Sequence, residues 1–128
     1  MSEALEVVAA IIRFEERYLC VQRGSHKYDY LAGKFEFPGG KMEAGESQET
    51  ALVREIREEL GMEIRPVRHL MSVGHQYPDF SLVLHAWICE AESPELELRE
   101  HQAACWLVAS GMSELDWVAA DLPLLGLL

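Results

Sequence analysis

The sequence has no long apolar run. No stretch approaches the roughly 20 apolar residues that a membrane-spanning helix needs. The first ten residues, MSEALEVVAA, contain no basic region followed by a small-residue cleavage site. We therefore expect no membrane partner, no secretory signal and a cytoplasmic location. Internal repeats and low-complexity tracts are also absent, so we expect one domain over residues 1–128.

Basic residues are scarce. Lysine and arginine together number 11, against 22 aspartates and glutamates, which gives a net charge of -11 at pH 7. Such a charge repels a long phosphate backbone, so tight binding of DNA or RNA polymers is disfavoured. A small polyanion is still compatible with this charge if a metal ion lies between it and the protein.

Cysteines are few and do not occur in pairs. Cys20, Cys89 and Cys105 are an odd number, and each lies inside an apolar stretch. A disulfide framework or a zinc site is therefore not expected. We expect three thiols buried in the core.

Alternating and β-branched apolar runs predict strands on both sides of one helical segment. Residues 5–14 and 18–23 indicate a hairpin around the charged EER. Further strands are expected at 34–40, 63–77, 80–90 and 103–110. Residues 111–128 contain helical turns, with Pro123 near a helix start. Interleaved strands and helices predict a mixed sheet in an α/β or α+β sandwich.

The segment between Gly45 and Gly61 has a helical pattern. Ser47 suits the position before the first turn, and Gly61 suits the position after the last. On a period of 3.6 residues the apolar side chains form one stripe, namely Leu52, Val53, Ile56 and Leu60. Three carboxylates form another face, namely Glu55, Glu58 and Glu59.

These three carboxylates repel one another, because side chains three and four residues apart are neighbours on a helix. Arg54 supplies part of the counter-charge, whereas Arg57 is expected toward the far side. A solvated acidic helix face accounts for the pattern without any ligand. A hard divalent cation, which prefers oxygen ligands, is the alternative.

The spacing of the whole segment favours the cation. Gly40 is followed after five residues by Glu46, and after seven more by REIREELGM. This pattern resembles the Nudix box of the Nudix hydrolases, with every fixed position filled. The resemblance to the MutT-type members extends over nearly the whole chain, through VVAAII, VQR, KFEFPGGK, EHQAACW and WVAADLPLL. Together with LHAW, the last two segments are most similar to the CTP pyrophosphohydrolase branch.

The resemblance implies a Nudix fold, an α/β/α sandwich with a mixed β-sheet in which the box forms a loop-helix-loop. It also implies an enzyme that cleaves a nucleoside diphosphate linked to another group, by attack of water on phosphorus. The implied cofactor is Mg²⁺, with Mn²⁺ as a substitute. The implied metal ligands are Gly39 (through its backbone carbonyl), Glu55, Glu58, Glu59 and Glu100.

The same resemblance implies a catalytic group of Glu55, Arg54 and Glu58. Glu55 is the general base or its metal-binding equivalent, and Arg54 orients it. Which glutamate acts as the base stays open, because carboxylates bound to a divalent ion are expected to stay ionised. Glu46 either pairs with Arg54, holds a metal-bound water, or stabilises the helix N-terminus by its charge. Glu100 either reaches the metals or is a solvated loop charge.

Four residues are expected to bind the nucleotide. Arg23 and Lys41 match positions that meet phosphate, although either can be a surface charge. Asp121 matches the position that contacts the base, and as an ionised acceptor it suits both the cytosine amino group and the N7–H of 8-oxidised guanine. Alternatively, Asp121 caps the helix around Pro123.

Phe80 is the fourth of these residues. It can stack on a base, as can Trp117, although aromatic side chains in such settings are commonly part of the core. Phe80 also occupies a position where the specialist for oxidised guanine carries a basic residue, which argues against stringent selectivity for that base. His85 and His101 lack partners at metal-ligand spacing, so we expect core or rim histidines.

The sequence therefore predicts a Mg²⁺-dependent pyrophosphohydrolase that converts a nucleoside triphosphate, (d)CTP or a modified (d)CTP, to the monophosphate and pyrophosphate. One alternative is an 8-oxo-dGTP diphosphatase that sanitises the nucleotide pool. Another is a nucleotide-binding sensor without catalysis, for which damaged box residues would be expected, and none is damaged. A hydrolase of dinucleoside polyphosphates or nucleotide sugars ranks below these. The expected assembly is a monomer or a homodimer.

Overall fold

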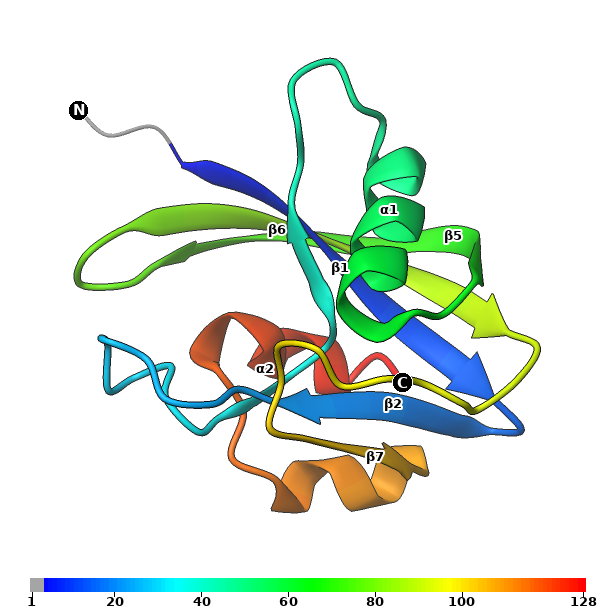
Figure 1. Cartoon of the computed structure of the whole chain (residues 1–128). Coiled ribbons are helices and arrows are strands. Elements are labelled where there is room, and N and C mark those ends of the chain that lie inside the picture. Colours follow the sequence, from blue (N-terminus) through cyan, green and yellow to red (C-terminus); the bar gives the residue numbers. More distant parts are fainter. Residues whose placement is uncertain (1–3) are drawn as a thin grey trace.

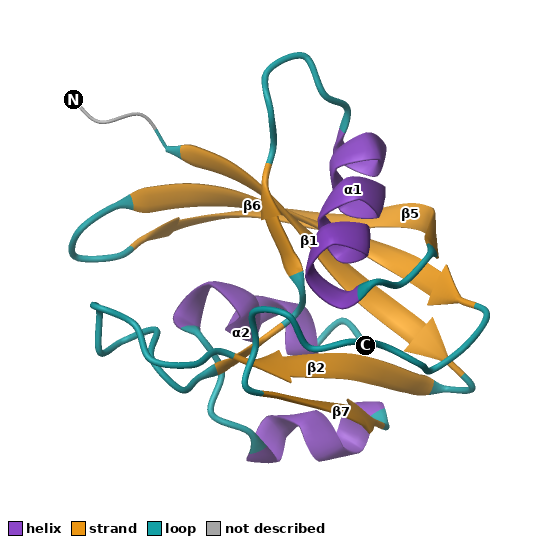
Figure 2. Cartoon of the chain, viewed as in Figure 1, coloured by secondary structure: helices purple, strands orange, loops and turns teal. Residues whose placement is uncertain are grey.

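The computed structural model describes residues 4–128 and contains one mixed sheet with few helices (Figures 1 and 2). The strands are β1 (Leu5–Phe14), β2 (Arg17–Gln22), β3 (Phe35–Glu36), β4 (Gly39–Lys41), β5 (Ile64–Gln76), β6 (Ser81–Ala91) and β7 (Ala103–Leu107). The helical elements are α1 (Gln48–Leu60), the 3₁₀ turns η1 (Ala109–Glu114) and η2 (Ala119–Asp121), and α2 (Leu122–Leu125). The predicted α+β class is confirmed.

Strand pairing in the sheet is mostly antiparallel. The main path runs β3-β2-β1-β6-β5, while β4 pairs with β1 and β7 pairs with β2. Among the named strands of residues 4–128, only β1 and β6 pair in parallel, in a register that runs from Leu5 opposite Leu82 to Arg13 opposite Glu90. The β1–β2 and β5–β6 hairpins that the sequence predicted are both present.

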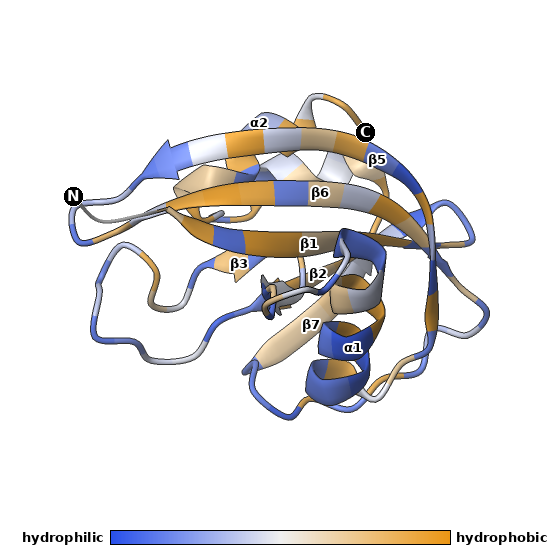
Figure 3. Cartoon of the chain, turned by 90° about the horizontal axis from the view of Figure 1, so that it is seen from above, coloured by the Kyte–Doolittle hydropathy of each residue, from blue (hydrophilic) through white to orange (hydrophobic). Residues whose placement is uncertain are grey.

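Two apolar clusters lie on opposite faces of this sheet, and β1 contributes to both. Val8, Ala10 and Ile12 pack with α1, whereas Ala9 and Ile11 pack with the C-terminal helical turns. This division follows from the two-residue period of a strand, which points successive side chains to opposite faces. Figure 1 shows α1 and α2 on opposite sides of β1, and Figure 3 shows apolar colouring along β1 and β6. The expected sandwich is therefore present.

Helix α1 has the predicted ends. The Ser47 hydroxyl accepts a hydrogen bond from the backbone N–H of Thr50 at 3.1 Å. Gly61 has a φ of 63°, the left-handed conformation that favours glycine after a helix. The buried face of α1 differs from the predicted apolar stripe in two ways. Val53 of the stripe is only half-buried, and Glu59, which was predicted on the acidic face, is buried.

Two predicted strands are shorter in the structure. The strand expected at 34–40 is divided into β3 and β4 at Pro38, which has no N–H to donate to a ladder. The Pro38 carbonyl still accepts from the Ala10 N–H at 2.7 Å. The strand expected at 103–110 ends at Leu107, because the chain turns into η1 from Ala109.

The three cysteines are free thiols, as expected. Cys20 and Cys89 are buried, while Cys105 is only half-buried. Burial raises the pKa of the Cys20 and Cys89 thiols to about 12, so both stay protonated and unreactive at neutral pH. Within residues 4–128, no helix is long and apolar enough to cross a membrane.

Candidate active site

A cavity of about 640 Å³ opens between the loop after β2, the β3–β4 segment, the tip of the β5–β6 hairpin and the segment around η2. Its walls include seven of the residues that the sequence nominated, namely Arg23, Gly39, Lys41, Glu59, Phe80, Glu100 and Asp121. The carboxylates Glu59 and Glu100 and the buried Asp121 all face this one space. Segments more than 80 residues apart in the sequence thus contribute to one site.

The glycine pair of β4 allows close approach of two other segments. A Cβ atom on Gly39 would collide with the backbone carbonyl of Val8 in β1. A Cβ atom on Gly40 would collide with the carboxylate of Glu55 in α1. Gly39 therefore requires glycine for steric reasons, whereas a Cβ atom at Gly40 would displace the Glu55 side chain, which lies directly against this glycine.

Arg54 connects the acidic residues of the box. Its guanidinium donates to both carboxylate oxygens of Glu46, with Nε–Oε2 at 2.7 Å and Nη2–Oε1 at 2.9 Å. Its Nη1 donates to Glu55 at 2.9 Å and to Glu58 at 3.3 Å. Hydrogen bonding to Arg54 holds the pKa of Glu46 at about 2, so that carboxylate stays ionised. The predicted pairing of Glu46 with Arg54 and the predicted contact of Arg54 with Glu55 are both present, while Arg57 instead binds Glu63.

Glu59 is the most deeply buried of the three helix carboxylates. Only 9% of the residue is exposed, and its Oε2 atom has no hydrogen-bond partner. Burial raises its pKa to about 9, with further contributions from the negative charges of Glu55, Glu100 and Glu36. Burial likewise raises the pKa of Glu55, although hydrogen bonding to Arg54 opposes the shift. The carboxylates thus share a site where their joint ionisation is unfavourable.

The carboxylate oxygens of these glutamates are the ligand type that a divalent cation prefers, although the side chains do not converge on a single ion position. Among residues 4–128, no three carboxylate, histidine or cysteine side chains are arranged to hold an ion. The Glu58 side chain is 60% exposed and does not line the cavity. Nevertheless, an unpartnered buried carboxylate oxygen beside like charges is what a hard cation would neutralise. The assignment of Gly39, Glu55, Glu58, Glu59 and Glu100 as ligands stays a prediction.

Asp121 lies at another part of the cavity wall, away from its predicted capping role. It makes no side-chain bond to the start of α2, and its Oδ2 accepts from the backbone N–H of Phe37 at 2.8 Å. Burial raises its pKa to about 8, and the charge of Glu36 adds to the shift. The raised pKa disfavours the ionised acceptor expected from the sequence and favours a protonated carboxyl at neutral pH. A carboxylic acid both donates and accepts hydrogen bonds.

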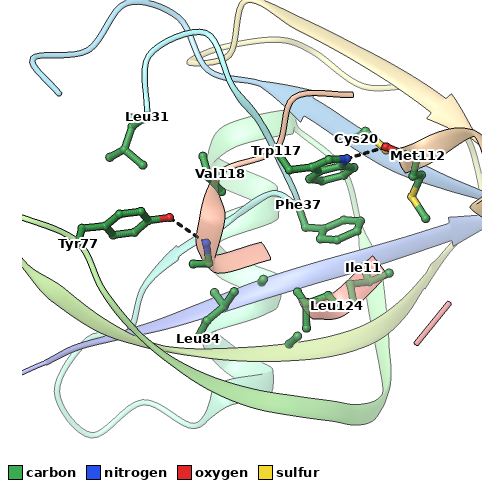
Figure 4. Packing of buried hydrophobic residues seen from close by; sticks show 13 residues of the cluster. Ile11, Cys20, Leu31, Phe37, Tyr77, Leu84, Met112, Trp117, Val118 and Leu124 are labelled. Atoms are coloured by element: carbon green, nitrogen blue, oxygen red, sulfur yellow. Dashed lines mark hydrogen bonds between the residues drawn. The ribbon is translucent and has the colours of Figure 1, made fainter. Parts of the chain in front are cut away.

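The aromatic residues separate into a cavity group and a core group. Phe80 lines the cavity, with its ring centroid 5.2 Å from that of Tyr77 and 6.0 Å from that of Tyr28. Trp117 is core, because its ring packs on Phe37 and its Nε1 donates to the Met112 carbonyl at 2.7 Å. Figure 4 shows this bond, together with the bond between the Tyr77 hydroxyl and the Ala120 N–H. Only Phe80 of the two stays a candidate for stacking on a base.

Sequence reasoning missed a polar network in the cavity wall. Glu36 accepts from Arg23 Nε at 2.8 Å through one oxygen and lies 3.0 Å from His101 Nε2 through the other. All three residues line the cavity, and the Nδ1 atom of His101 is buried without a partner. Glu36 alternates with Phe35 and Phe37, so the two-residue period of a strand already indicated that its carboxylate points away from the two rings.

His85 does not line the cavity and instead contacts Ser72 and Glu6. Lys41 is exposed at the cavity rim.

Known proteins resemble the chain over nearly its whole length. The NUDIX domain model matches residues 4–125. The chain is 40% identical to the CTP pyrophosphohydrolase of Escherichia coli (strain K12), over 94% of this chain and 88% of that protein. It is 32% identical to the 8-oxo-dGTP diphosphatase of the same strain, over 94% and 93%. The solution structure of the E. coli ORF135 protein is similar with a TM-score of 0.82 at 39% identity, over 97% of this chain and 87% of that one.

Proposed function

The chain belongs to the Nudix hydrolase family, whose fold and enzyme class it shares, and from that premise we propose that it is a pyrophosphohydrolase of (d)CTP or a modified (d)CTP. The reaction consumes one water and yields the nucleoside monophosphate and pyrophosphate. Two relatives that align with 94% of this chain are named for nucleotide substrates, CTP and 8-oxo-dGTP, which supports a nucleotide substrate.

One observation carries the proposal: a single cavity joins Glu59 of the box and the loop residue Glu100 to the buried Asp121. Glu59 and Glu100 line it together with Arg23 and Lys41, which suits a polyphosphate and its counter-ions. Asp121 lines the same cavity and suits the edge of a base. A volume of about 640 Å³ lies within the range of small-molecule sites.

The protonated Asp121 matches cytosine. Cytosine presents the N4 amino group as a donor and the N3 atom as an acceptor on adjacent positions. A carboxylic acid can accept from the first and donate to the second. The Phe37 N–H bond to Oδ2 fixes the orientation of the carboxyl group.

Mg²⁺ would be held by Glu55, Glu58 and Glu59 of the box together with Glu100 of the segment before β7. The bound ions would neutralise phosphate charge and lower the pKa of a coordinated water. Arg54 fixes Glu55 through the 2.9 Å bond to its Oε1, and Glu46 fixes Arg54 from the other side. Glu55 therefore serves as the general base or as a ligand with a fixed orientation, and Arg23 and Lys41 bind the phosphates.

8-Oxo-dGTP is a second candidate substrate, and the same Asp121 carboxyl favours it. Oxidised guanine presents N7–H as a donor beside the O6 acceptor, whereas ordinary guanine presents two acceptors on that edge. A carboxylic acid therefore distinguishes oxidised from ordinary guanine. The apolar Phe80 beside Tyr77 and Tyr28 offers no charged partner for the oxidised base.

A substrate panel tests the proposal. The purified protein with Mg²⁺ is assayed against CTP, dCTP, 5-methyl-dCTP, 8-oxo-dGTP, dGTP, ADP-ribose and diadenosine tetraphosphate, with and without added pyrophosphatase. We expect phosphate to appear only with pyrophosphatase, and fastest from a cytidine nucleotide. Fastest release from 8-oxo-dGTP would favour the second candidate, and turnover of only ADP-ribose or the dinucleotide would contradict both.

A further inference from the structure

The loop between β6 and β7 carries Glu100 and is attached to the C-terminal end of α1. The backbone N–H of Glu97 donates to the Leu60 carbonyl at 2.8 Å. Leu96 packs against the apolar cluster on the α1 face of the sheet. The loop thus contacts the helix three residues before Glu100.

Arg99 makes the second attachment. Its Nη1 donates to the carbonyls of Arg57 at 3.1 Å and Glu58 at 3.2 Å. Its Nη2 binds Glu97 at 2.8 Å within the loop. The Arg57 carbonyl already accepts from the backbone N–H of Gly61 at 3.1 Å, and Arg99 adds a second donor there. A cation beside the last carbonyls of a helix is also favoured by the helix dipole. Gly61 leaves room for this contact, because a Cβ atom there would lie 3.0 Å from Arg99 Nη2.

On the other side of Glu100 the chain is attached to the sheet. His101 contacts Glu36 of β3 at 3.0 Å, and the backbone N–H of Gln102 donates to the Gln22 carbonyl of β2 at 2.9 Å. Glu100 is itself exposed and lines the cavity with Glu59. It therefore sits between one attachment to the box helix and one to the strands.

We propose that Arg99 is a positioning residue that fixes Glu100 opposite the carboxylates of α1, by binding the helix-end carbonyls of Arg57 and Glu58. This inference rests on the proposed function, in which Glu100 contacts the metal ions. Arg99 does not line the cavity, so we assign it no direct contact with substrate or metal. Without the Arg99 bonds, the entropy cost of ordering this loop is added to the free energy of metal binding. Glu100 then spends a smaller fraction of time in the position from which it reaches the metal site.

The test compares Arg99→Ala with Arg57→Ala. Both variants remove an exposed arginine near the C-terminal end of α1, but the Arg57 side chain pairs with Glu63 and does not bind the loop.

Mn²⁺ affinity is measured without nucleotide from the electron paramagnetic resonance signal of the free ion. The constants kcat and KM are measured with Mg²⁺ and CTP. For Arg99→Ala we expect kcat and Mn²⁺ affinity to fall by about tenfold, as for residues that orient a ligand. The KM and the unfolding temperature of Arg99→Ala should change little. Arg57→Ala should match the wild type in all of these measurements. Arg99→Lys should recover part of the lost kcat and Mn²⁺ affinity.

A double-mutant cycle with Glu100→Gln separates positioning from general stabilisation. If Arg99 acts through Glu100, adding Arg99→Ala to Glu100→Gln should cause little further loss of Mn²⁺ affinity. Additive losses, or an Arg99→Ala variant with wild-type Mn²⁺ affinity, would overturn the inference. Because Mn²⁺ binding needs no substrate, this result stands even if CTP is not hydrolysed, which would instead refute the proposed function.

Discussion

At the residue scale, the environment of a side chain determines its chemistry more than its type does. Asp121 and Glu46 are both carboxyl groups, yet the pKa of Asp121 is raised to about 8 and that of Glu46 is lowered to about 2. Burial dominates at Asp121, whereas two hydrogen bonds from Arg54 dominate at Glu46. One group is a neutral donor and acceptor at pH 7, and the other is a fixed negative charge.

Replacement of Asp121 by Asn should change how stability depends on pH. The folded state holds the Asp121 proton up to about pH 8, whereas the unfolded chain releases it near the ordinary pKa of 3.8. The folded state therefore binds more protons within this window, and stability falls as pH rises, by at most about 1.4 kcal/mol per pH unit for one group. Asn cannot titrate and can still accept from the Phe37 N–H.

Urea unfolding of both proteins between pH 4.5 and 8.5 measures this difference. Asp121→Asn should resemble the wild type near pH 4.5 and gain relative stability as the pH rises. Glu36, Arg23 and Tyr77 lie near Asp121 in both proteins, so the comparison isolates the group at position 121. A pH-independent difference between the two proteins would show that Asp121 does not titrate in this window.

Removing charge from the box should separate activity from stability. Glu55→Gln and Glu59→Gln should each lower turnover by about 100-fold or more, as expected for a lost catalytic acid or base. Neither should weaken the metal-free fold, because these carboxylates repel each other and burial opposes their ionisation. Steady-state kinetics and thermal unfolding without metal measure the two effects. Wild-type turnover in both variants would contradict the site.

At the element scale, local signals predicted α1 well but did not predict the long-range contacts within the cavity wall. Ser47, Gly61 and the apolar period of the helix act within a few residues of one another, so the sequence reveals them directly. The bond from Phe37 N to Asp121 and the contact of Glu36 with His101 join positions 84 and 65 residues apart. No local pattern encodes such pairs, so the raised pKa of Asp121 and the contacts of Glu36 could be found only from the structure.

The two glycines of β4 should respond differently to the same substitution. Gly39→Ala places a methyl group against the Val8 backbone, which cannot move without disturbing the β1–β4 pairing. Gly40→Ala places it against the Glu55 carboxylate, a side chain that can rotate away. Gly39→Ala should therefore lose stability, while Gly40→Ala should lose mainly turnover.

Thermal unfolding and kcat of the two alanine variants form a matched comparison. The unfolding temperature should fall further for Gly39→Ala, and the folded Gly40→Ala protein should show the larger loss of kcat. If Gly40→Ala unfolds at the lower temperature and keeps its activity, Glu55 is not the group that this turn positions.

At the scale of the whole molecule, a protein with a net charge of -11 is proposed to bind a substrate that is itself a polyanion. The cavity is lined by the basic Arg23 and Lys41 and by the acidic Glu59 and Glu100, so the proposed phosphate binding would depend on cations that neutralise the carboxylates. The sheet separates two apolar clusters, and the cavity opens between the segments that these clusters hold in place. The expectation of a monomer or homodimer stays a prediction, which light scattering after size exclusion would check.

The central claim is that a folded, acidic protein releases pyrophosphate from a nucleoside triphosphate. Phosphorus-31 nuclear magnetic resonance of CTP incubated with the protein and Mg²⁺ tests it most directly, because the spectrum identifies every phosphorus-containing product. We expect equal amounts of CMP and pyrophosphate, and no reaction when the Mg²⁺ is chelated. Formation of CDP and inorganic phosphate, or an unchanged CTP spectrum with folded protein, would contradict it.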